Sequence, residues 1–190
     1  MAEVLPMVYL ARHGETAWSL SGQHTGRTDL PLTGRGEQNA RRLGERLKGL
    51  SFASVLTSPL KRAARTCDLA GFGVAAREVS GNSRNIGKTQ AELEWDYGEY
   101  EGRRTAEIHR ERREWDLFRD GCPGGETPDQ VGARADDAVR RVPRPRRERA
   151  ALFKRPLPAR VCRSLVGART AIREIFFPQH GEPQRAGIRT

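Results

Sequence analysis

The order of apolar and polar positions in the first 70 residues predicts alternating strands and helices. Val8–Ala11 and Ala53–Thr57 are short apolar runs of the kind that form buried strands. Between them, apolar residues recur at spacings of three and four, as on the buried face of a helix: Ala40, Leu43, Leu47 and Leu50. Pro59 predicts the first turn of a second helix, which runs to about Ala70. This order favours an α/β fold with a mostly parallel sheet.

The second half of the chain carries fewer such patterns. Residues 103–119 are predicted to form one charged helix, and residues 127–142 a further helix. The helix predicted over residues 127–142 begins with three helix-start signals. They are the N-cap hydroxyl of Thr127, a proline in the first turn at Pro128 and a glutamine at N3, Gln130. Pro143 ends it. Beyond that point, Ala150–Phe153 predicts a short strand, and residues 172–177 form another apolar patch.

The chain of 190 residues has a formal net charge of +10, and its distribution matters more than its size. Residues 140–190 hold 14 of the 34 Lys and Arg but only 3 of the 24 Asp and Glu, together with 6 of the 11 prolines. We therefore divide the chain into a core over residues 1–142 and a basic, Pro- and Arg-rich tail over residues 143–190. No apolar run is long enough to span a membrane and no signal peptide is apparent, so we expect a cytoplasmic protein.

Cysteine spacing indicates neither a disulfide framework nor a zinc site. Cys67, Cys122 and Cys162 are expected to be reduced thiols with structural roles only.

Arg12 and His13 directly follow the first predicted strand. Ligands of open α/β sheets bind at the carboxyl ends of the strands, so both side chains are expected in a cleft. A neutral imidazole can attack phosphorus, and an adjacent guanidinium binds phosphate oxygens in a forked geometry. The alternative for this dipeptide alone is a structural histidine beside an arginine.

A second arginine follows the second predicted strand. Arg62 lies in the first turn of the helix that begins after Ser58, and the positively polarised end of that helix favours anions. Two arginines at one sheet edge suit phosphoryl transfer, which depends on positioning and on stabilising spread negative charge. Lys61 and Arg65 are expected to be solvated.

A third segment, residues 93–102, places acids among aromatic side chains. A carboxyl in such surroundings can protonate a leaving oxygen and later accept a proton from water. Four acids compete for that role, and their spacing does not choose among them: Glu94, Asp96, Glu99 and Glu101.

Together, these three blocks resemble the histidine phosphatase superfamily, in its phosphoglycerate-mutase-like branch, over about residues 5–142. The resemblance implies a three-layer α/β/α fold and a reaction without metal or other cofactor. It makes His13 the phosphorylated nucleophile, Arg12 and Arg62 phosphate ligands, and Glu94 the proton donor and acceptor. The remaining residues that it implies to contact substrate are Ser19, Gln23, Thr25, Gly26 and Tyr97.

Finer features, the loop 21–30 and the segment 119–127 among them, resemble the sedoheptulose-bisphosphatase-like phosphatases. The longer proline-rich insert of the mutases is absent. The resemblance thus favours hydrolysis of a sugar phosphate or bisphosphate through a phosphohistidine. Phosphoglycerate-mutase-type phosphotransfer and a catalytically impaired family member remain alternatives, and a homo-oligomer remains open.

The tail departs from the family pattern. Relatives carry a second pocket histidine after a late strand, whereas here Lys154 follows the strand predicted at Ala150–Phe153, so the C-terminal strand and helix are expected to be missing or altered. His180 is the one late candidate, while His24 and His109 are expected to be solvated.

One hypothesis for the tail is that the natural reading frame is lost near residues 140–155. The rival is a genuine basic extension that binds RNA or anionic surfaces, and a third reading is a merely solvated or disordered segment. We do not expect a nucleic-acid partner, because the tail lacks aromatic residues interleaved for base stacking.

Overall fold

The computed structural model describes residues 7–52, 54–73, 94–133, 149–153 and 171–175. Its described strands form one sheet in the order β2-β3-β1-β4, and every neighbouring pair is parallel. The strands are β1 (Met7–Ala11), β2 (Ser54–Thr57), β3 (Arg149–Phe153) and β4 (Ala171–Ile175). The α/β class and the parallel sheet predicted from the sequence are confirmed for this part of the chain.

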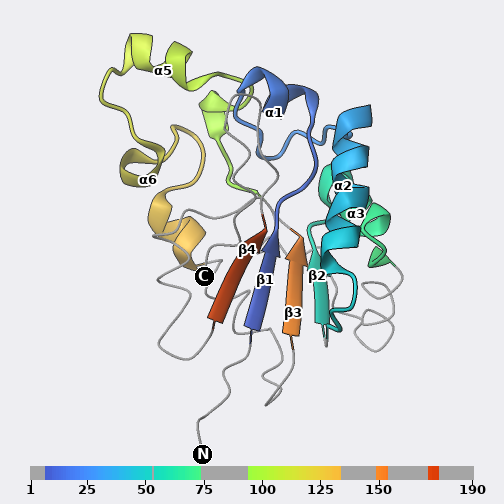
Figure 1. Ribbon diagram of the computed structural model, residues 1–190. Coiled ribbons are helices and arrows are strands. Elements are labelled where there is room, and N and C mark those ends of the chain that lie inside the picture. Colours follow the sequence, from blue (N-terminus) through green and yellow to red (C-terminus); the bar gives the residue numbers. More distant parts are fainter. Residues whose placement is uncertain (1–6, 53, 74–93, 134–148, 154–170, 176–190) are drawn as a thin grey trace, which may run out of the picture.

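The basic C-terminal part of the chain contributes two of these strands. β3 pairs with β1 on one side and with β2 on the other, so that Ala151 lies opposite both Tyr9 and Val55. The predicted strand at Ala150–Phe153 is confirmed, and β4 includes residues 172–175 of the apolar patch predicted at 172–177. Because β1 and β2 flank the same strand in parallel, the segments that follow them begin at the same edge of the sheet (Figure 1).

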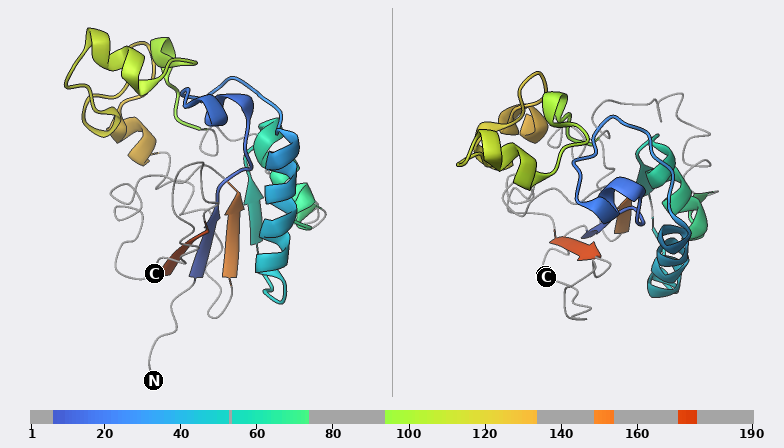
Figure 2. Two further views of the ribbon diagram at one scale, coloured as in Figure 1. Left: turned by 45° about the horizontal axis from the view of Figure 1, so that its top comes forward. Right: turned by 90° about the horizontal axis from the view of Figure 1, so that it is seen from above.

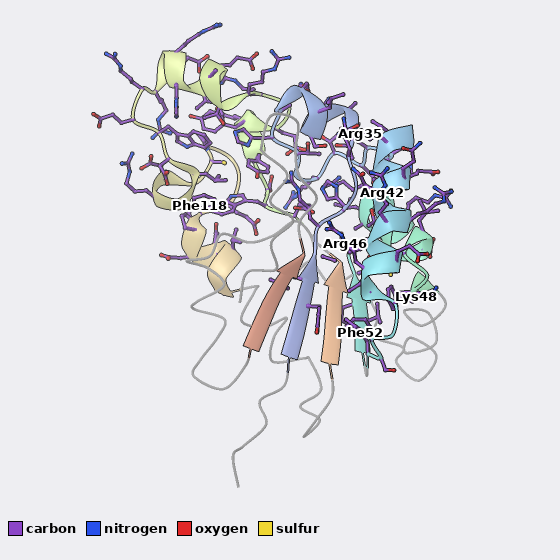
Figure 3. The ribbon with its side chains drawn as sticks, viewed as in Figure 1. Arg35, Arg42, Arg46, Lys48, Phe52 and Phe118 are labelled. Atoms are coloured by element: carbon purple, nitrogen blue, oxygen red, sulfur yellow. The ribbon has the colours of Figure 1, made fainter. Side chains whose placement is uncertain are left out.

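Two helices pack side by side against the β2 and β3 end of the sheet, α2 (Gly34–Leu47) and α3 (Lys61–Leu69) (Figures 1 and 2). Thr33 caps α2 by accepting a hydrogen bond from the Gly36 amide at 3.0 Å. Of the predicted apolar stripe, Ala40, Leu43 and Leu47 are buried in α2, whereas Leu50 lies beyond the end of the helix and is half-buried. Polar residues such as Arg42 in the helix and Lys48 at its end are exposed (Figure 3). The resulting core holds Tyr9, Ala11, Leu43, Leu47, Val55, Cys67 and Ala70.

A second hydrophobic cluster forms within residues 94–131 and lies, with α1 (Ala17–Ser21), beyond the carboxyl ends of the strands (Figure 2). Its buried residues are Trp95, Tyr97, Tyr100, Ile108, Trp115, Cys122 and Val131. The helix start predicted at Thr127 is confirmed, since the Thr127 amide donates to Gln130 Oε1 at 2.9 Å and the Gln130 amide to Thr127 Oγ1 at 3.3 Å. The three-layer arrangement stays a prediction, because residues 134–142, which were predicted to continue this helix, lie outside the described ranges.

Two helix predictions need correction. The helix after β2 begins at Lys61, so Pro59 precedes it instead of standing in its first turn. Residues 103–119 form two short helices, α5 (Thr105–Glu111) and α6 (Leu117–Asp120), and not one. The break lets the Trp115 ring pack edge-on against Tyr100 and donate from Nε1 to the Gly121 carbonyl at 2.8 Å, while the Asp116 side chain caps α6.

Among the described helices, none is both long and apolar enough to cross a membrane. Cys67 and Cys122 are buried free thiols, as expected, and burial raises the pKa of Cys122 to about 12. Cys162 lies outside the described residues.

Candidate active site

His13 stands just after β1 with its ring fixed in one tautomer. Its Nδ1 lies 2.7 Å from the Gly14 carbonyl oxygen, and because a carbonyl only accepts, Nδ1 must carry the proton. Nε2 therefore keeps its lone pair, and it lies 4.0 Å from Glu94 Oε1. Both side chains are 4% exposed. The ring thus offers a nucleophilic nitrogen beside a buried carboxyl group.

Burial keeps this imidazole neutral. It lowers the pKa of His13 from 6.5 to about 4, against the opposing effects of the Glu94 carboxyl and the Gly14 hydrogen bond. The positive charges of Arg62 and Arg12 lower the pKa further. At neutral pH the ring is therefore uncharged, which is the form that can attack phosphorus.

The backbone that carries His13 is packed directly against the start of α2. A Cβ on Gly14 would stand 2.3 Å from the Gly36 carbonyl oxygen, and one on Gly36 would stand 2.1 Å from the Glu15 carbonyl oxygen. Only glycine fits at both positions, because the neighbouring atoms are backbone and cannot turn away. This contact fixes the position of the nucleophile loop relative to α2.

The two predicted phosphate-binding arginines occupy different surroundings. Arg12 is half-buried and lines the cavity beside His13. Arg62 is fully buried in the first turn of α3, and its Nη1 and Nη2 donate to the carbonyls of Thr28 at 2.8 Å and Gly26 at 2.7 Å. Arg62 therefore also holds the loop that carries predicted substrate contacts.

The amino end of α3 is occupied by a carboxylate of the chain itself. The Lys61 amide donates to Asp29 Oδ1 at 2.8 Å, so the anion that this helix end attracts is a side chain of the preceding loop. Lys61 and Arg65 are exposed, as predicted, and Arg65 pairs with Glu37 at 2.9 Å.

A cavity of about 220 Å³ opens at His13. Arg12 and His13 form part of its wall, and the other lining residues are Ser19, Gly22, Gln23, His24, Thr25 and Thr105. The Gln23 amide is held in place by donating to the Gly102 carbonyl at 2.6 Å. Thus Ser19, Gln23 and Thr25, three of the predicted substrate contacts, lie together with the nucleophile.

Gly26 and Tyr97 are not part of that wall. The Gly26 amide is bound to the Glu101 carboxylate at 2.9 and 3.0 Å, and a Cβ at this position would stand 2.1 Å from the Trp95 carbonyl oxygen. Tyr97 is buried and stacks on the His24 ring at a centroid distance of 4.7 Å. Tyr97 therefore contacts the cavity wall through His24, and Gly26 directly follows the lining residue Thr25.

The prediction that His24 is solvated is wrong. The residue is half-buried and lines the cavity, with its ring stacked on Tyr97 and edge-on to Trp115 at 5.6 Å. Its Nε2 lies 3.3 Å from the hydroxyl of Thr105, a cavity residue that no motif indicated. His109 is exposed as expected, although its Nε2 lies 2.9 Å from the Trp115 carbonyl oxygen. His180 lies outside the described residues.

The structure separates the four acids that spacing left equivalent. Glu94 is the one placed against His13. Asp96 pairs with Arg27 at 2.9 Å and accepts from the Gly98 amide at 3.1 Å, whereas Glu99 is exposed. Glu101 faces the loop and accepts from its backbone amides. Among the described residues, no group of three or more His, Cys, Asp and Glu side chains could hold a metal ion.

Comparison with protein families matches residues 8–161 to the histidine phosphatase superfamily (branch 1). This match reaches past β3. Similar curated proteins include the sedoheptulose 1,7-bisphosphatase of Saccharomyces cerevisiae, 38% identical over 160 residues, which are 75% of this chain and 57% of that protein. An acid phosphatase of Mycobacterium tuberculosis is 42% identical over 132 residues, which are 68% of this chain and 60% of that protein. The chain thus spans about three fifths of the length of these relatives.

Solved structures show the same likeness. An open reading frame product of Mycobacterium tuberculosis superposes with a TM-score of 0.64 and 33% identity, over 83% of this chain and 76% of that one. A phosphoglycerate mutase of Thermus thermophilus superposes with a TM-score of 0.56 and 30% identity, over 78% and 77% of the two chains. The similarity therefore extends through the sheet as well as the motifs.

Proposed function

The chain belongs to the histidine phosphatase superfamily, and from this premise we propose that it hydrolyses a small phosphorylated metabolite through a phosphohistidine at His13. The observation that carries the proposal is the state of the His13 ring. It is neutral, its proton is held on Nδ1 by the Gly14 carbonyl, and its free Nε2 lies beside Glu94 at the cavity.

The reaction proceeds in two displacements. Nε2 of His13 attacks phosphorus, the bond between phosphorus and the ester oxygen breaks, and Glu94 gives its proton to the leaving alcohol. Water then attacks the phosphohistidine while the Glu94 carboxylate takes a proton from it, so that the P–N bond breaks and inorganic phosphate leaves. Both residues return to their starting states.

Two arginines near His13 stabilise the negative charge of the phosphoryl group. Arg12 lines the cavity and stabilises the oxygens that carry the spread charge in the transition state. Arg62 acts from the first turn of α3, where its charge already influences the His13 ring. The Arg12 guanidinium can bind two phosphate oxygens at once in a forked geometry.

The cavity wall favours a polyhydroxylated substrate. Ser19, Gln23 and Thr25 supply hydroxyl and amide groups, and the lining residues that the structure describes include no acid that would repel a second phosphate. A sugar phosphate or bisphosphate meets these conditions. The name of the yeast relative, a sedoheptulose 1,7-bisphosphatase, supports the same substrate class.

Mutase-type phosphotransfer is the second candidate, favoured by the likeness to the Thermus thermophilus phosphoglycerate mutase. In that reaction an alcohol of the substrate, in place of water, accepts the phosphoryl group from His13.

Phosphate release from a panel of sugar monophosphates and bisphosphates tests the proposal. We expect release by the full chain, none by His13→Ala, and unchanged release by His109→Gln, which alters an exposed histidine on α5. Activity that survives His13→Ala would overturn the mechanism. Interconversion of phosphoglycerate isomers without phosphate release, followed by NMR, would favour the mutase instead.

A further inference from the structure

Residues 26–28 are held from two sides by side chains of opposite charge. On one side the Glu101 carboxylate accepts from the Gly26 amide at 2.9 and 3.0 Å and from the Thr28 amide at 3.0 Å. On the other side the Arg62 guanidinium donates to the carbonyls of the same two residues, at 2.7 and 2.8 Å. The carboxylate thus binds the N–H groups and the guanidinium binds the C=O groups of one short segment.

The same arginine is joined to the nucleophile through α3. The Thr66 hydroxyl donates to the Arg62 carbonyl at 2.6 Å and accepts from the Gly14 amide at 3.0 Å. The carbonyl of Gly14 in turn accepts from His13 Nδ1. A path of hydrogen bonds, linked by the covalent bonds within Arg62 and Gly14, therefore runs from Glu101 through residues 26–28 to the His13 ring.

The chemistry of a buried arginine explains why such a path matters. Arg62 is fully buried, and a long side chain there keeps one orientation only if fixed acceptors hold its fork. Its acceptors are two loop carbonyls, and that loop keeps its own position because a carboxylate binds its amides. Hydrogen bonds to an ionised carboxylate are roughly twice as strong as those between neutral groups.

We propose that Glu101 is a positioning residue that acts through residues 26–28 to set the Arg62 guanidinium beside His13. The role rests on the proposed phosphatase function, in which Arg62 stabilises the phosphoryl charge. Glu94 lies against the nucleophile, Glu99 is exposed and Asp96 pairs with the Arg27 side chain, whereas Glu101 accepts from the backbone amides of residues 26 and 28.

Three variants test the proposal in the full chain: Glu101→Ala, Glu101→Gln and, as the matched control, Glu99→Ala in the short 3-10 helix η2 (Gly98–Tyr100) that precedes Glu101. Misplacing a catalytic group by about 1 Å costs on the order of 10²-fold, so Glu101→Ala is expected to lower kcat/KM for a sugar phosphate by roughly 10- to 100-fold. Glu101→Gln keeps an oxygen for the two amides and is expected to stay within about fivefold of the wild type. Glu99→Ala should have the same kcat/KM as the wild type.

A second readout follows the His13 ring by NMR during a pH titration. The groups whose charges act on that ring are Glu94, Arg62 and Arg12. If Glu101→Ala displaces Arg62, one of the charges that lower the pKa of His13 is weakened, so the ring should titrate at higher pH than in the wild type. The acid limb of kcat/KM should move in the same direction.

These results separate failure of the positioning role from failure of the phosphatase function. If the wild type releases no phosphate from any substrate, the proposed phosphatase function is overturned. The role of Glu101 is still decided in that case by the NMR titration of His13. An unchanged titration in Glu101→Ala overturns the positioning role. So does a loss of activity that matches the unfolded fraction in a thermal melt, because the residue would then serve the fold alone.

Discussion

Lowering the pH from 8 to 5 is expected to destabilise the folded protein through His13. In the unfolded chain this ring takes up a proton near its ordinary pKa of 6.5, whereas burial holds the pKa of the folded protein at about 4. Between these values the unfolded state binds more protons, so the free energy of unfolding falls as the pH falls. The loss begins near 6.5 and is complete below about 4.

The size of the effect follows from the gap between the two pKa values. One pKa unit corresponds to about 1.4 kcal/mol, so the full penalty is about 3 kcal/mol, of which about 2 kcal/mol is present at pH 5. A loss of this size is a large part of the free energy of unfolding of a typical domain, which is about 5–15 kcal/mol.

Urea unfolding of the wild type and of His13→Gln at pH 8 and pH 5 measures the effect. Other groups titrate in both proteins, so the difference between their pH dependences isolates His13. We expect the wild type to lose about 2 kcal/mol more than the variant on acidification. Equal losses in the two proteins would refute the conclusion that His13 is buried in its neutral form.

Three further predictions concern the loop, the acid and the tail. Gly14→Ala places a Cβ 2.3 Å from the Gly36 carbonyl oxygen and should lower the free energy of unfolding in urea by about 1–3 kcal/mol. Gly34→Ala is the control, because its Cβ would meet no neighbouring atom within 4 Å, and it should not destabilise the protein. Equal effects of the two substitutions would contradict the packing argument. Glu94→Gln should lower kcat/KM for a sugar phosphate by about 10²–10⁴, and much less for an aryl phosphate whose leaving group needs no proton; equal losses on both substrates would remove Glu94 as the acid. If the natural reading frame is lost near residues 140–155, the nucleotide sequence read in another frame encodes a histidine next to a glycine beyond residue 153. Codons 155–157 permit this, because Arg-Pro-Leu shifted by one base can encode Gly-His; a nucleotide sequence without such a motif refutes the hypothesis.

Local patterns predicted the elements whose formation depends on nearby residues. The apolar stripe of Ala40, Leu43 and Leu47 is buried, and the reciprocal hydrogen bonds at Thr127 and Gln130 are those of a capping box. Each depends on residues three or four positions apart, which the sequence displays directly.

Contacts between distant segments could not be predicted in this way. The break between α5 and α6 follows from the burial of Trp115 against Tyr100, which helical periodicity does not encode. The place of His24 depends on aromatic residues more than 70 positions away, as its stacking on Tyr97 shows. Propensity is overridden where tertiary packing decides.

The assignment of the acids illustrates the same limit. Glu94 and Glu101 stand seven positions apart in one aromatic segment, and nothing in their spacing indicates that one faces His13 and the other binds residues 26–28. The family resemblance indicated Glu94 as the proton donor, and the structure places Glu94 Oε1 4.0 Å from His13 Nε2. The part played by Glu101 emerged only from the hydrogen bonds.

In the proposed mechanism, His13 attacks phosphorus through Nε2, because its Nδ1 donates to the Gly14 carbonyl. The most direct test is to quench the protein during turnover of a phosphate-labelled substrate and to identify the labelled atom by mass spectrometry and phosphorus NMR. We predict phosphate on His13 at Nε2, and none in His13→Ala. Label on Nδ1, label on another residue, or turnover without any labelled histidine would contradict this mechanism.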